Sequence, residues 1–134
     1  MSSVASSAAR WFSRVVWVGI VANLALAIPT LFMPARLLEM SNLPVTNPLL
    51  WTQFSALLLI LLSAFYVPAA LDPLRYTLVA WLSVFARLAG VLFFVLFQAR
   101  EYHMLGYFDL VFFVPEAALL FAATRAAGVP PRRS

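Results

Sequence analysis

Four long apolar stretches dominate this sequence of 134 residues and leave little chain for anything else. They cover about residues 11–32, 49–71, 76–97 and 104–123, and each is close to the roughly 20 residues that an α-helix needs to cross the hydrocarbon core of a bilayer. Hydrophobic residues make up 64% of the chain and charged residues only 10%, unlike a soluble domain. The pattern predicts one all-α domain, an integral membrane bundle of four antiparallel helices.

Every basic residue other than the single histidine is an arginine, and the arginines flank the apolar stretches unevenly. Two connections hold only Arg36 and Arg100, whereas the two ends of the chain and the connection near residue 75 hold Arg10, Arg14, Arg75, Arg125, Arg132 and Arg133. Because cytoplasmic loops carry the excess of basic residues, both termini are predicted to face the cytoplasm. The net charge of +4 then reflects arginines that contact anionic membrane lipids, and we expect no nucleic-acid partner.

Two segments outside the apolar stretches have their own patterns. Residues 33–47 form the outer connection, and Arg36 to Met40 within it are amphipathic, so this segment is predicted to be either an ordinary loop or a short interfacial helix. Residues 124–134 are predicted to form a flexible cytoplasmic tail.

Three charged residues lie inside the third and fourth apolar stretches, where an unpaired charge costs several kcal/mol. They are Arg87 in the third stretch and Asp109 and Glu116 in the fourth. Counted at about 1.5 Å per residue, Arg87 and Glu116 fall within about one helical turn of the bilayer midplane on neighbouring helices. We therefore expect Arg87 to pair with Glu116. Asp109 lies seven residues before Glu116 and should face the same interior.

Polar residues in the first two stretches complete a candidate intramembrane polar site. Asn23 lies on a stripe of small and polar residues in the first stretch, and Gln53 lies beside a similar stripe in the second. We expect a cavity in the outer half of the bundle, near residues 33–47, lined by Asn23, Gln53, Arg87, Asp109 and Glu116. Helix packing by small residues and a purely structural ion pair would explain the same pattern, and both interpretations stay open.

The sequence excludes several kinds of chemistry. Without cysteine there is no disulfide, thiolate metal site or iron–sulfur cluster, and His103 is the only histidine, so we predict no metal site. No nucleophile motif is present, and no catalytic residue is assigned.

Short motifs spread along the chain resemble those of a bacterial family. They are Asn47-Pro48, Asp72-Pro73-Leu74-Arg75, Ala86-Arg87-Leu88-Ala89-Gly90, and Phe108-Asp109-Leu110 followed by Pro115. Together with Asn23 and Pro34, they resemble the small, mostly uncharacterised four-helix membrane proteins loosely called DoxX-like. The resemblance implies a multi-pass protein of the bacterial inner (cytoplasmic) membrane and, for some relatives, an accessory place beside redox enzymes. It assigns no functional residue.

Three functions fit these observations. The first is a non-enzymatic accessory subunit or a binder of an amphiphilic ligand, a quinone or a lipid, in contact with membrane lipids and with a membrane protein partner or further copies of the chain. The second is a membrane enzyme acting on an isoprenoid or lipid, with Glu116 or Asp109 as general acid or base and Arg87 stabilising negative charge. The third is a proton or ion pathway along Asp109 and Glu116. We predict the first, with no cofactor other than such a bound quinone or lipid.

Overall fold

The computed structural model describes residues 3–45 and 49–128, and every regular element within these ranges is a helix. The predicted all-helical fold is therefore confirmed. The α-helices are α1 (Ser3–Phe32), α2 (Pro34–Met40), α3 (Leu50–Leu71), α4 (Thr77–Leu92) and α5 (His103–Ala127). A π-helical turn, η1 (Phe93–Phe97), continues α4, and a 3-10 turn, η2 (Arg100–Tyr102), precedes α5.

Four helical segments of the described chain are long and apolar enough to cross a membrane, with mean hydropathies of 2.1, 2.2, 2.2 and 1.7 in chain order. Two of them exceed their predicted lengths: α1 already begins at Ser3, and α5 continues to Ala127, so residues 124–127 are helical rather than part of a flexible tail. Ala8 and Ala9 in the extended start of α1 pack with the buried Ala123, the last residue of the predicted fourth stretch. Residues 129–134 of the predicted tail lie outside the described residues.

The connections differ in detail from the sequence pattern. Residues 33–47 contain the short helix α2, after which Asn42 adopts the left-handed conformation (φ 56°) that asparagine tolerates well and turns the chain toward α3. The Asp72 carboxylate accepts a hydrogen bond from the backbone N–H of Arg75 (3.2 Å), so it stabilises a turn, and α4 begins only at Thr77. Asn47-Pro48 lies outside the part of the chain that is described.

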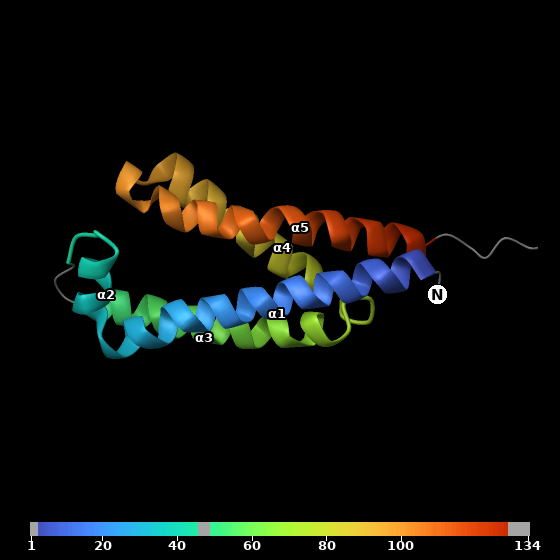
Figure 1. Cartoon of the computed structure of the whole chain (residues 1–134), viewed down its shortest axis with the longest axis horizontal. Helices are drawn as coiled ribbons and strands as arrows, with labels where there is room; N and C mark the ends of the chain where they lie inside the picture. Colours follow the sequence, from blue (N-terminus) through green and yellow to red (C-terminus); the bar gives the residue numbers. More distant parts are fainter. Residues whose placement is uncertain (1–2, 46–48, 129–134) are drawn as a thin grey trace, which may run out of the picture.

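Helix α1 lies at the centre of the packing. It packs against α3 and α5, whereas α4 packs mainly against α5 and less extensively against α3. In Figure 1, α1 and α4 run in one direction and α3 and α5 in the other. The N-terminus and the end of α5 lie together, which we call the terminal end, and α2 lies at the opposite end, the α2 end (Figure 1).

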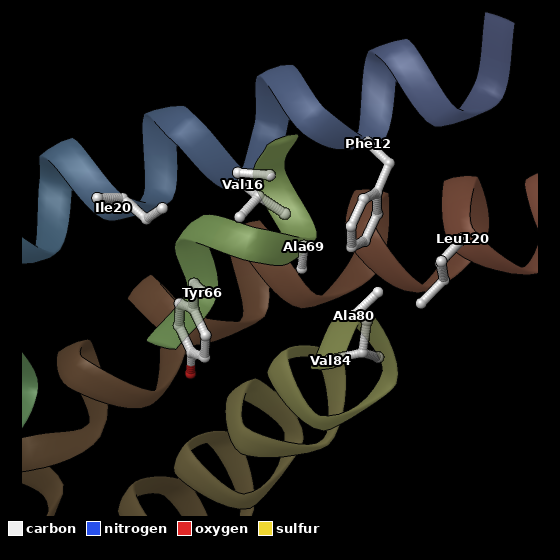
Figure 2. Close-up of a cluster of buried hydrophobic side chains, with 9 residues drawn as sticks. Phe12, Val16, Ile20, Tyr66, Ala69, Ala80, Val84 and Leu120 are labelled. Carbon is white, nitrogen blue, oxygen red and sulfur yellow. The ribbon is translucent and has the colours of Figure 1, made fainter. Parts of the chain in front are cut away.

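The apolar core occupies the half of the molecule near the terminal end. Figure 2 shows Phe12, Val16 and Ile20 of α1 facing residues of the other three long helices. Many of the partners are alanines, which let helix backbones approach closely. The buried cluster also includes Tyr66, Ala69, Ala70, Ala80, Val84 and Leu120.

The outward faces of the long helices are apolar as well. Large side chains such as Phe65, Leu78 and Phe97 are at least 70% exposed. A soluble monomer rarely exposes apolar side chains so extensively, and the pattern fits a molecule surrounded by lipid.

Candidate functional site

Arg87 of α4 is buried, with 3% of its surface exposed, and its side chain joins three helices. Its Nη1 donates to Asp109 Oδ1 of α5 at 2.9 Å and to Asn23 Oδ1 of α1 at 3.2 Å. The amide of Asn23 in turn donates through Nδ2 to Ser63 Oγ of α3 at 3.2 Å. We call Asn23, Ser63, Arg87 and Asp109 the polar layer. It connects all four long helices through hydrogen bonds.

Two glycines make room for this polar layer. A Cβ at Gly90, three residues after Arg87, would overlap the carboxylate of Asp109. A Cβ at Gly19 of α1 would lie 2.8 Å from Arg87 Nη2. The side chains of Arg87 and Asp109 therefore occupy space that only glycine leaves free, which fixes where the charged groups lie along the bundle.

Aromatic rings surround the guanidinium group of Arg87. Its carbon Cζ lies 4.8 Å from the ring centre of Phe112, 5.8 Å from that of Phe108 and 5.9 Å from that of Tyr66. Rings at these distances attract a cation through their negative faces, and the attraction is stronger where water is excluded. The phenol ring of Tyr66 points away from α1 in Figure 2. These rings stabilise the buried charge of Arg87 without further hydrogen bonds.

The expected direct pair between Arg87 and Glu116 is wrong. Glu116 is buried, with 2% of its surface exposed, but its Oε2 has no hydrogen-bond partner, and neither has Arg87 Nε. The ion pair is formed with Asp109 instead. The depth estimate placed Glu116 at the height of Arg87, yet a long arginine side chain can reach along the bundle to an acid at another height. The space beside Gly90 admits the Asp109 carboxylate.

Gln53 has a role in joining two helix ends. Its Nε2 donates to the backbone carbonyl of Leu31 at 3.1 Å, near the end of α1. Carbonyls in the last turn of a helix have no partner within the helix, so this bond satisfies one of them and ties α3 to α1. The side chain is half-buried and makes no bond to the polar layer.

A cavity of about 410 Å³ lies on the α2 side of the polar layer. Asn23 and Asp109 form its polar end, whereas Gln53, Arg87 and Glu116 are not among its lining residues. Its walls come from α1, α2, α3, α5 and η1 and are mainly apolar: Leu26, Ala27, Leu37, Leu38, Leu59, Phe94, Leu105 and Phe108. The volume lies within the range of about 300–1,000 Å³ that is usual for small-molecule sites.

Sequence reasoning missed the aromatic surroundings of Arg87 and the wall that η1 contributes to the cavity. It expected residues 33–47 near the cavity, and Leu37 and Leu38 of α2 line it. Phe108 and Phe112 are four residues apart on either side of Asp109, so their spacing around an intramembrane acid was a readable signal. The contribution of Phe94 had no such signal, because it depends on how the π-helical turn η1 continues α4.

In residues 3–45 and 49–128, no group of three or more His, Asp or Glu side chains is placed to hold a metal ion. The ring nitrogen Nε2 of His103 lies 3.2 Å from the carbonyl oxygen of Gln98, close to the start of α5.

Comparison with known proteins gives no relative: no family model, curated protein or solved structure matches the chain. The resemblance to DoxX-like proteins therefore stays a prediction from short motifs.

Proposed function

We propose that this chain is a small multi-pass membrane protein that binds an amphiphilic ligand, such as a lipid or a quinone, without catalysing a reaction on it. The observation that carries the proposal is the cavity of about 410 Å³, whose apolar walls end at the Asn23 and Asp109 side chains of the polar layer. An apolar cavity with a few convergent polar groups is the usual form of a site for such molecules.

The membrane setting of the proposal is the inner membrane of a bacterium, with both termini in the cytoplasm. Four long apolar helices support membrane residence, and the exposed apolar faces support contact with lipid. The excess of arginines at the two ends of the chain and near Arg75 supports the orientation. In this orientation the terminal end faces the cytoplasm, and the cavity lies in the outer half of the membrane.

The positions and contacts of Asp109 and Glu116 favour ligand binding over acid–base catalysis. Asp109 reaches the cavity, but its carboxylate is held by Arg87, which is an arrangement for presenting a fixed hydrogen-bond acceptor. Glu116 is buried and does not line the cavity, so it has no route to a ligand bound there. A general acid or base must lie within hydrogen-bond reach of the group it serves.

The test is to identify what the full chain retains after purification in a mild detergent. Native mass spectrometry and lipid extraction would compare the protein with Leu38→Trp, which places a larger ring in the cavity wall, and with Leu58→Trp, a matched change on the exposed face of α3. We expect a stoichiometric amphiphile in the unaltered protein and in Leu58→Trp, and its loss from Leu38→Trp. Folded protein without any retained amphiphile, or equal retention by the two variants, would contradict the proposal.

A further inference from the structure

The polar end of the cavity offers a hydrogen-bond acceptor, the carboxylate of Asp109. Asn23 uses Oδ1 to accept from Arg87 and one N–H of Nδ2 to donate to Ser63, and its amide group has one more N–H. Asp109 accepts from Arg87 through Oδ1, while no hydrogen bond to its Oδ2 is formed within the described part of the chain. A carboxylate oxygen can accept bonds but has none to give. The group of a ligand that reaches Asp109 must therefore be a donor.

Two of the hydroxyl groups in the cavity walls have no free hydrogen to offer a ligand. Thr30 Oγ1 donates to the carbonyl of Leu26 at 2.6 Å, and Ser55 Oγ donates to that of Trp51 at 2.8 Å, so both hydrogens are used within their own helices. Tyr102 also lines the cavity, but it precedes Asp109 by seven residues, which corresponds to about 10 Å along a helix. A donor from Tyr102 would serve the far part of a ligand.

The charge balance at the same place argues against an ionic head group. Arg87 and Asp109 compensate each other, and Arg87 is shielded from the cavity, which its side chain does not line. An anionic head would meet the acceptor oxygens of Asp109 without a facing cation. A cationic head would compete with Arg87, which is held in place by Asn23 and by aromatic rings. A quinone presents only carbonyl acceptors, which could accept from the Asn23 amide but would leave the Asp109 carboxylate without a donor.

We propose that the cavity selects a neutral lipid whose head is a free hydroxyl group, a long-chain alcohol in the broad sense, and that Asp109 accepts the hydrogen bond of that hydroxyl. This inference rests on the proposed function and narrows its ligand class. The apolar walls hold the chain, and the ion pair with Arg87 fixes the carboxylate that selects the head. An alcohol is preferred over a quinone, a fatty acid or an amine of the same chain length.

The experiment is a competition assay on the full chain in detergent, with radiolabelled 1-dodecanol as the probe. The competitors share the same chain length: unlabelled 1-dodecanol, dodecyl methyl ether, lauric acid and dodecylamine, with decylubiquinone added for the quinone class. The methyl ether is the decisive competitor, because it keeps the oxygen and loses only the hydrogen-bond donor. We expect it to bind about tenfold more weakly than the alcohol, or weaker still, as the loss of one bond to a charged acceptor implies.

Two variants separate this inference from the proposed function. In Leu38→Trp the probe should no longer bind, which reports on the cavity alone. In the paired variant Arg87→Leu with Asp109→Leu, which removes both charges and the acceptor oxygens together and so leaves no orphaned ion, the tenfold preference for alcohol over ether should disappear.

The outcomes are distinct. If the probe binds equally well to Leu38→Trp, the cavity is not the binding site and the proposed function fails. If Leu38→Trp abolishes binding but alcohol and ether compete equally in the unaltered protein, only the assignment of the hydroxyl head is overturned. Stronger competition by decylubiquinone, lauric acid or dodecylamine than by the alcohol overturns it as well. A preference for alcohol that survives in the paired variant overturns the role of Asp109.

Discussion

Gly90→Ala tests the polar layer most directly, because its effect on the free energy of unfolding should change sign when Asp109 is replaced. In Gly90→Ala the added methyl group would overlap the Asp109 carboxylate, which must move away from its place beside Arg87. Overpacking of this kind costs about 1–3 kcal/mol. The higher helix propensity of alanine returns at most about 1 kcal/mol. We expect a net loss of up to about 3 kcal/mol in the free energy of unfolding.

In an Asp109→Ala background the same substitution meets no carboxylate. Gly90→Ala should then be neutral or stabilising by up to about 1 kcal/mol, because only the helix propensity changes. Reversible unfolding in mixed detergent micelles, followed by circular dichroism, would measure the four proteins of this double-mutant cycle. The control is Gly106→Ala, whose Cβ would lie 2.6 Å from Val95 Cγ2, so its cost should not depend on residue 109. Equal effects of Gly90→Ala in both backgrounds would refute the placement of Asp109 against α4.

Three further predictions address the charges and the orientation. Arg87→Leu and Asp109→Leu should each lower the free energy of unfolding by about 3–5 kcal/mol, because each breaks a buried ion pair. The double variant should recover much of this loss, whereas additive losses would mean that the two side chains do not interact. Glu116→Gln should leave the free energy of unfolding unchanged or raise it, because the carboxylate Oε2 has no hydrogen-bond partner to lose. A decrease of more than about 2 kcal/mol would reveal a partner that the structure does not show. Ser41→Cys on this cysteine-free chain should react with an impermeant thiol reagent only from the outer side of the membrane, and labelling only from the cytoplasmic side would invert the proposed orientation.

The sequence predicts which polar residues are buried better than it predicts how they pair. An arginine or acid inside a long apolar stretch must face the protein interior, and Arg87, Asp109 and Glu116 are all wholly or largely buried. The same reasoning could not predict which of the two acids, Asp109 or Glu116, pairs with Arg87. It depends on the local fit of α4 to α5 at Gly90, and a depth count along ideal helices does not contain that information.

The two amides illustrate the same limit. Asn23 and Gln53 both lie in apolar stretches on or beside stripes of small residues, so the pattern gives them similar roles. In the structure Asn23 joins the polar layer, whereas Gln53 bonds the free carbonyl of Leu31 at the end of α1. A helix end supplies unpaired carbonyls wherever it falls, and the position of that end relative to the next helix is a property of the tertiary fold.

The polar layer divides the molecule into a packed half and an open half, and this division links ligand binding to stability. On the terminal side, residues such as Phe12, Val84 and Leu120 fill the space between helices, whereas on the α2 side α1, α3 and α5 line the cavity together with α2 and η1. Asp109 stands at the boundary, with 18% of its side chain exposed, while Arg87 behind it is covered.

A ligand seated on Asp109 would remove water from the ion pair, and electrostatic attraction strengthens as the local dielectric falls. A ligand that binds only the folded protein also raises the free energy of unfolding of that protein. Above Kd, the increase grows with the logarithm of the ratio of ligand concentration to Kd. A half-open bundle of this kind is therefore expected to be least stable when empty, and its stability should depend on the lipid that fills it.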